Sequence, residues 1–181
     1  MKDVRAIGMS SGAALALEAA AHGLSIDKLA LYEPPFIVDD SRPPLPREYV
    51  AQLDALITAG RRGDAVAYTM TTAVGLPTEV VASMRDQPFW PAFEAVAHTL
   101  SYDGRVLGDT QFGSPAPLTR WSSVTVPALV VDGGASPASM QHAAQALVDV
   151  LPHARRRTLD GQTHEVAPEV LAPVLTEFFT G

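Results

Sequence analysis

The chain has 181 residues, of which 47% are hydrophobic and 18% charged, so it is long enough for one compact domain and too apolar for a disordered, collagen-like or coiled-coil chain. Its 20 acidic and 13 basic residues give a net charge of -7, which disfavours a basic surface for nucleic acid or anionic lipid. The sequence contains no cysteine, which excludes disulfides, thiolate metal sites and a cysteine nucleophile.

Targeting and membrane segments are not predicted. The N-terminal residues 1–8 run out of apolar side chains before they could form a signal-peptide core, and no later segment approaches about 18 consecutive apolar residues. The pair Asp39 and Asp40 lacks histidine or carboxylate neighbours at the spacing that metal ligands need. The sequence therefore predicts a cytoplasmic protein with no metal, no cofactor, and no membrane or nucleic-acid partner.

A strand, a helix and a second strand are predicted at the start of the chain. Residues 4–9 form a short apolar run, residues 13–21 are almost all Ala and Leu, and residues 26–32 form a second apolar run that ends before two prolines. Gly23 marks the end of the helix. A strand, helix and strand within this length form a βαβ unit, which has parallel strands and a right-handed crossover.

The middle of the chain, residues 37–122, has a different character. Prolines recur along it, and the segments between them have helical patterns, near residues 47–59, 62–74, 78–86 and 90–100. These patterns predict an all-helical insertion.

Strand and helix patterns alternate again in the C-terminal third. In order they predict a buried strand, a helix, a short strand and a final helix, over residues 126–132, 137–151, 155–159 and 168–179. The whole alternation predicts an α/β fold, in which a parallel sheet carries the helical insertion at one strand end. The predicted domains are a core of residues 1–36 and 123–181 and an insertion of residues 37–122.

A nucleophile motif lies between the first predicted strand and the first predicted helix. Residues 8–12 read Gly-Met-Ser-Ser-Gly and match G-x-S-x-G, in which the central serine sits on a sharp, strained turn with its hydroxyl exposed. The two glycines let the strand and the helix approach, and the N–H of Ser11 at the helix N-terminus can face a developing oxyanion. Ser10 is the predicted nucleophile and Ser11 the predicted oxyanion donor, with a plain Gly/Ser-rich turn as the alternative.

A serine nucleophile needs a general base, and the chain has five histidines. Four of them lie on or beside predicted helices or in a polar loop: His22, His98, His142 and His153. The fifth, His164, follows a short strand and precedes the last helix, which places it at the same strand-end face as Ser10. His164 is therefore the predicted base.

On these residues the chain resembles the α/β-hydrolase superfamily, from the nucleophile elbow at residues 8–12 to the C-terminus. The resemblance implies that residues 37–122 are a helical cap, that residues 126–132 precede the late acid loop, and that His164 is the base. The superfamily places further strands and an oxyanion loop before the elbow, whereas seven residues precede Gly8 here. The resemblance therefore implies the C-terminal portion of the fold, without the loop that normally supplies a second oxyanion N–H.

The resemblance offers several positions for the acid of the triad. Many members place an aspartate about four residues beyond the late strand, where this chain has Ser136. Other members place the acid after the strand that follows the elbow helix, where this chain has Glu33 before two prolines. A carboxylate held there suits the role of orienting the imidazole of the base. Glu33 is the predicted acid, Asp132 is the alternative, and Asp103 and Asp109 are the next candidates.

The predicted function is hydrolysis of a carboxylic ester or related carbonyl substrate through a Ser-His-acid triad and an acyl-enzyme. The alternative is an inactive or partner-dependent α/β-hydrolase chain that acts as an interaction module, because an unpaired edge strand favours association. The predicted partners are a small-molecule substrate and either a second copy of the chain or a separate N-terminal half of the fold.

Overall fold

The computed structural model describes residues 4–181 and divides the chain into two compact units. The first unit comprises the chain up to Pro44 together with Asp109–Gly181, and the second comprises Leu45–Gly108. The division falls inside the predicted insertion of residues 37–122, and the role of that insertion as a cap stays a prediction. Residues 1–3, which belong to the N-terminal run considered above, lie outside the described residues.

Four parallel strands form the sheet of the first unit. They are β1 (Arg5–Met9), β2 (Lys28–Tyr32), β3 (Ala128–Gly133) and β4 (Ala154–Leu159), and they pair in the order β1-β2-β3-β4. The predicted α/β fold with a parallel sheet is confirmed. Within the described residues β1 pairs with β2 alone, so it lies at one edge of the sheet.

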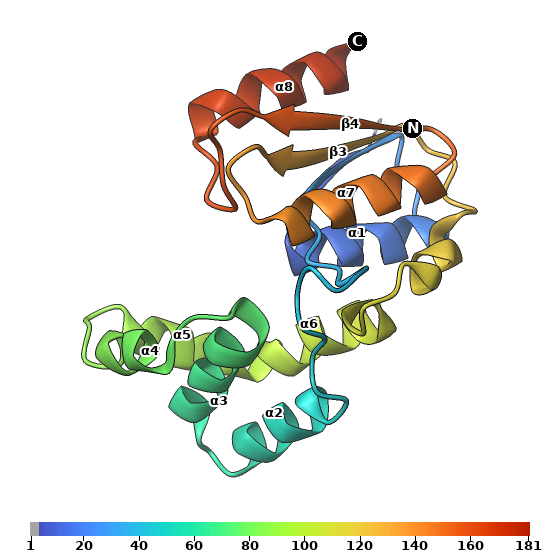
Figure 1. Ribbon diagram of the computed structural model, residues 1–181. Coiled ribbons are helices and arrows are strands. Elements are labelled where there is room, and N and C mark those ends of the chain that lie inside the picture. Colours follow the sequence, from blue (N-terminus) through green and yellow to red (C-terminus); the bar gives the residue numbers. More distant parts are fainter. Residues whose placement is uncertain (1–3) are drawn as a thin grey trace. The chain divides into compact units, whose positions relative to one another are not determined.

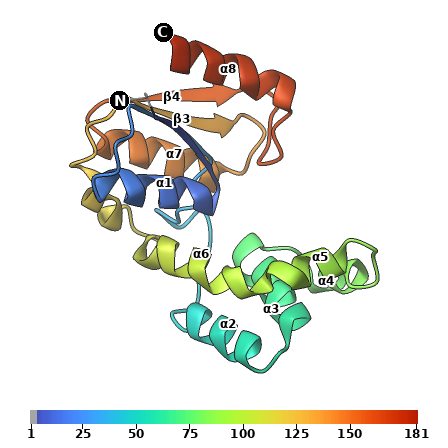
Figure 2. The same cartoon turned by 180° about the vertical axis from the view of Figure 1, so that it is seen from behind.

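Helices cover both faces of this sheet (Figure 1; Figure 2 from behind). One face carries α1 (Ser11–Ala21) and α7 (Ala138–Val150), and the other carries α8 (Pro168–Thr180). Each helix follows a strand, as the alternating strand and helix patterns predict. Because all four strands run in one direction, the loops that follow them meet at one edge of the sheet.

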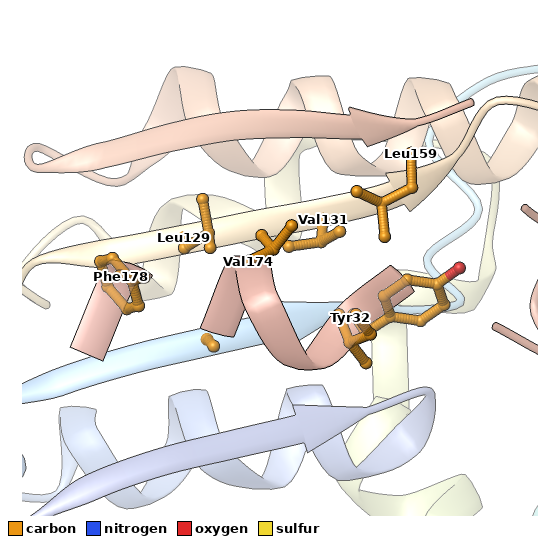
Figure 3. Packing of buried hydrophobic residues seen from close by; sticks show 8 residues of the cluster. Tyr32, Leu129, Val131, Leu159, Val174 and Phe178 are labelled. Carbon is orange, nitrogen blue, oxygen red and sulfur yellow. The ribbon is translucent and has the colours of Figure 1, made fainter. Parts of the chain in front are cut away.

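The core of the first unit is built from alternate strand residues. Side chains from the strands and from α8 form one apolar cluster (Figure 3). The strands contribute Ala30, Tyr32, Leu129, Val131 and Leu159, and α8 contributes Leu171, Val174 and Phe178. The intervening strand residues Leu29, Leu31 and Val130 are also buried and point to the opposite face, since side chains alternate along a strand. A strand buried on both faces reads as a continuous apolar run, which is the pattern seen at residues 126–132.

The second unit is entirely helical. Its elements are α2 (Tyr49–Thr58), α3 (Arg62–Tyr68), the π-helix η1 (Thr69–Val74), α4 (Thr78–Met84), α5 (Trp90–Val96), the 3-10 helix η2 (Ala97–Thr99) and α6 (Leu100–Leu107). Its buried cluster consists of Val66, Val81, Trp90 and Ala97. Two further 3-10 helices, η3 (Gly108–Gln111) and η4 (Ala116–Trp121), precede β3.

Two predicted helices of the insertion differ from the structure. The helix predicted over residues 62–74 changes to π geometry at Thr69, and the helix predicted over residues 90–100 is interrupted by η2 before α6 begins. The helix α6 was not predicted. Gly104 lowers the intrinsic helix propensity of α6. It also leaves room for the side chain of Val50 on α2, which lies 2.9 Å from where a Cβ of residue 104 would be. Packing against α2 therefore stabilises α6.

Candidate active site

The candidate residues gather at the carboxyl edge of the sheet. Ser10 directly follows β1, Glu33 directly follows β2, and His164 lies in the loop between β4 and α8. The side chain of Glu33 is fully buried and that of His164 is 44% exposed. Three strand ends therefore bring together residues that are far apart in the sequence, as expected at this edge of a parallel sheet.

Ser10 occupies a strained turn between β1 and α1. Its φ is 54° and its ψ is -130°, and its N–H donates to the carbonyl of Tyr32 at 3.0 Å. A Cβ added at Gly8 would lie 2.3 Å from the carbonyl oxygen of Gly12, so the strand and the helix approach as closely as the motif requires. The sharp turn predicted for this serine is therefore present.

The second glycine of the motif has a different environment. A Cβ added at Gly12 meets no heavy atom within 4 Å among the described residues, apart from the backbone of its own helix. The expectation that both glycines are needed for the approach of strand and helix is wrong for Gly12, because the close contact is made at Gly8. Ser11 begins α1, where the first N–H groups have no partner within the helix. Its N–H therefore lies at the N-terminus of α1, and its role as an oxyanion donor stays a prediction.

His164 and Glu33 form a direct hydrogen-bonded pair. The Nδ1 atom of His164 lies 2.8 Å from Oε2 of Glu33, and the other carboxylate oxygen accepts the N–H of Gly133 at 2.8 Å. Both oxygens of the buried carboxylate are therefore bonded. Within residues 4–181 no hydrogen bond joins the hydroxyl of Ser10 to His164. The structure therefore brings the predicted base and acid into contact, and it places the predicted nucleophile at the same edge of the sheet.

The environment of Glu33 keeps it ionised. Burial pushes its pKa upward, but the hydrogen bond from His164, the nearby Ser136 hydroxyl and the hydrogen bond from the Gly133 N–H outweigh burial and hold the pKa below its usual value. Ser136 is 6% exposed, and in the described part of the chain its Oγ makes no hydrogen bond of good geometry. The hydroxyl lies close enough to the carboxylate to favour its charge without a well-aligned bond.

Backbone contacts fix the loop that carries His164 against the end of β3. The N–H of Ala135 donates to the carbonyl of Gln162 at 2.9 Å, and the side-chain oxygen of Gln162 accepts the N–H of Ala167 at 2.9 Å. A Cβ added at Gly133 would lie 2.3 Å from that same carbonyl of Gln162. Glycine is therefore required at this position so that the two loops can pack together.

Two of the three alternative acids form ion pairs with arginines. Asp132 is fully buried and binds the guanidinium of Arg156 through two bonds of 2.7 and 2.9 Å, with Thr158 at 3.2 Å. Asp109 pairs with Arg120, and Asp103 lies on α6 in the second unit. Of the four carboxylates considered, Glu33 is the one that contacts His164.

The other four histidines belong to other elements of the chain. His142 on α7 bonds Asp39 at 2.6 Å, His22 ends α1, His153 precedes β4 and His98 lies in the second unit. The described residues contain no group of three or more His, Cys, Asp or Glu side chains that could hold a metal ion. Among residues 4–181, no helix combines the length and the apolar composition that crossing a membrane requires.

Sequence reasoning missed two supporting residues of the site. They are Gly133, which lets the His164 loop approach β3, and Tyr32, whose hydroxyl donates to the carbonyl of Thr163 in that loop at 2.6 Å. Both contacts depend on how the strand ends meet, and a single sequence does not show this. The signal available was the position of Tyr32 directly before Glu33 at the end of a buried strand.

No family model and no curated protein matches the chain, but solved structures do. An α/β hydrolase from Sphaerobacter thermophilus is 56% identical, with a TM-score of 0.86 over 98% of this chain and 68% of that protein. An α/β-hydrolase enzyme from a Medee basin deep-sea metagenome library has 16% identity and a TM-score of 0.61, over 99% of this chain and 66% of its own. A hydrolase from Oleispira antarctica has 16% identity and a TM-score of 0.60, over 100% of this chain and 66% of that protein. This chain spans about two thirds of each protein.

Proposed function

Because the chain belongs to the α/β-hydrolase family, we propose that it is a serine hydrolase that cleaves a carboxylic ester or related carbonyl compound through Ser10, His164 and Glu33. The observation that carries this proposal is the 2.8 Å contact between His164 and the buried Glu33, at the same sheet edge as a serine with φ of 54°. Acyl transfer needs a serine on a strained turn, and it needs an imidazole that is oriented by a carboxylate.

In the proposed first step, the oxygen of Ser10 attacks the carbonyl carbon while His164 takes the hydroxyl proton. Glu33 accepts the Nδ1–H of His164, which fixes the tautomer and stabilises the imidazolium that forms. The N–H of Ser11 donates to the oxyanion of the tetrahedral intermediate. When the intermediate collapses, the carbonyl–oxygen bond of the ester breaks and the departing alcohol takes the proton from His164.

In the proposed second step, water attacks the acyl group on Ser10 and gives a proton to His164. Collapse of this second intermediate breaks the bond to the Ser10 oxygen, which recovers its proton from His164, and a carboxylic acid leaves. The same base therefore acts twice, and the chain returns to its starting state.

A fluorophosphonate probe tests the proposal on the 181-residue chain, because it reports the attack of the serine without needing the natural substrate. We expect the wild type to be labelled, Ser10→Ala to lose labelling and Ser11→Ala to retain most of it, since the oxyanion donor at position 11 is a backbone N–H. Labelling that survives Ser10→Ala would assign the nucleophile elsewhere.

We also propose that β1 is a site of association. The side chains of Val4, Ile7 and Met9 are 45, 46 and 42% exposed, and β1 pairs on one side alone within the described residues. Ile7 and Met9 lie in register with Ala30 and Tyr32, so they extend the apolar face that α8 covers. The occupant we propose is a segment that adds a strand beside β1. The 56% identical relative has additional chain from which such a segment can come, because the match covers 68% of it. A second copy of this chain is the alternative occupant.

A further inference from the structure

Tyr32 binds both the Ser10 turn and the loop that carries His164. Its backbone carbonyl accepts the N–H of Ser10 at 3.0 Å, and its phenolic hydroxyl donates to the carbonyl of Thr163 at 2.6 Å. Thr163 is the residue immediately before His164, and Glu33 is the residue immediately after Tyr32. One strand end thus binds the nucleophile turn, the backbone of the base loop and, through Glu33, the imidazole itself.

The side chain of Tyr32 combines an apolar body with one polar contact. The residue is 1% exposed, and its ring lies at the end of the apolar cluster under α8, with the hydroxyl pointing out of that cluster (Figure 3). Burial raises the pKa of Tyr32 to about 12, and the nearby charges of Glu33 and Asp132 act in the same direction. The hydroxyl therefore keeps its proton and can donate throughout the ordinary pH range.

Packing alone does not explain a tyrosine at this position. Phenylalanine would fill the same apolar volume and would bury no hydroxyl, whose desolvation costs free energy unless it is hydrogen-bonded. The hydroxyl of Tyr32 donates its hydrogen bond to a loop carbonyl and not to a residue of the apolar cluster. The role of the hydroxyl is therefore to hold the His164 loop.

We propose that Tyr32 is a positioning residue for the reaction proposed above, on which this role rests. The imidazole of His164 is held at Nδ1 by Glu33, but a single bond between two side chains leaves the ring free to move with its backbone. The bond from Tyr32 to Thr163 fixes that backbone, and the bond to the Ser10 N–H fixes the nucleophile turn to the same residue. Tyr32 therefore sets the distance between nucleophile and base, which a hydrolase needs before substrate arrives.

The test compares Tyr32→Phe with Val174→Ala in the full 181-residue chain. Val174 belongs to the same apolar cluster, and its side chain has no polar atom that could bind the backbone of Thr163. Val174→Ala therefore controls for a loss of packing in the cluster without the loss of a hydrogen bond. The measurement is fluorophosphonate labelling as a function of probe concentration, below the melting temperature of both variants. It gives the limiting rate constant and the probe concentration for half-maximal rate separately.

We expect Tyr32→Phe to lower the limiting rate constant about 10-fold with an unchanged half-maximal concentration, as for the loss of one buried hydrogen bond. Val174→Ala should label at the wild-type rate. Hydrogen exchange should be faster at residues 161–165 in Tyr32→Phe and unchanged there in Val174→Ala. If the wild type and Tyr32→Phe are labelled equally fast, the role of Tyr32 is overturned and the proposed function is not. If the wild type is not labelled, the proposed function is overturned.

Discussion

Ser10 and Glu33 are the two non-glycine residues with positive φ in the described chain, at 54° and 43°. They directly follow Met9 and Tyr32, which are paired in register on neighbouring strands. Such backbone conformations cost about 1–3 kcal/mol each and persist where the surrounding structure determines them. The strain thus lies at adjacent strand ends, at the two positions proposed as nucleophile and acid.

Replacing Glu33 by glutamine should reduce catalysis strongly. The amide removes the negative charge that stabilises the imidazolium, and loss of such a carboxylate can cost up to about 10⁴ in rate. Ester turnover by Glu33→Gln should therefore approach the level of His164→Ala. Asp132→Asn is the matched control, because Asp132 binds Arg156. Full activity in Glu33→Gln with loss in Asp132→Asn would transfer the acid role to Asp132.

Acid should destabilise the wild type through Glu33. The folded chain holds the pKa of Glu33 below 4.5, so near and below that pH the unfolded chain binds more protons and the free energy of unfolding falls as pH falls. Above that range the contribution is fully present. Urea unfolding from pH 7 to pH 3 should show a smaller pH dependence in Glu33→Gln than in the wild type. Identical slopes would mean that Glu33 is not stabilised in its charged form.

The two glycines of the nucleophile motif should respond differently to alanine. Gly8→Ala places a Cβ 2.3 Å from a backbone oxygen, which must move, so we expect a loss of several kcal/mol in unfolding free energy and loss of labelling. Among the described residues outside its own helix, the Cβ of Gly12→Ala meets no heavy atom within 4 Å, so this variant should stabilise α1 by up to about 1 kcal/mol. Thermal unfolding measures both. Equal destabilisation by the two variants would contradict the packing at Gly8.

Removing Arg156 should destabilise the fold more than removing its neighbour Arg155. Arg156→Met leaves the fully buried Asp132 without its guanidinium, which costs about 3–5 kcal/mol in buried pairs. Arg155 lies over the ring of Phe178 and is exposed, so Arg155→Met should cost less than about 1 kcal/mol. Chemical denaturation of the two variants gives the comparison. Equal losses would show that Asp132 does not depend on Arg156.

Association through β1 should be visible in sedimentation. Where the proposed segment is absent, the exposed edge of β1 is open to a second copy, so we expect the average mass of the chain to rise with concentration. Ile7→Lys should reduce that rise, because Ile7 lies on the exposed apolar part of the edge strand. Val80→Lys, on an exposed apolar residue of the second unit, is the control. Ester turnover should increase when an N-terminal extension is supplied. A chain that stays monomeric at high concentration and is as active as the extended form would contradict this proposal.

The strands and the nucleophile turn could be predicted because their signals are local. Apolar runs, an Ala-rich segment and two glycines around Ser10 each report on a few neighbouring residues. The pairing of His164 with Glu33 spans 131 positions and came from a family resemblance, since no periodicity connects them. Arg156 shows the limit: three consecutive arginines indicate exposed edge charge, but the middle one binds a buried aspartate.

Two strand ends place a side chain beside the backbone of Gly133. Glu33 reaches it from β2, while Ser136 stands next to it from the turn after β3, with its Oγ 2.9 Å from where a Cβ of residue 133 would be. Both positions are buried, so two carboxylates there would repel each other and one of them would take up a proton. Only one of the two strand ends can therefore supply the negative charge of the proposed triad, and an aspartate at position 136 would require a neutral side chain at position 33.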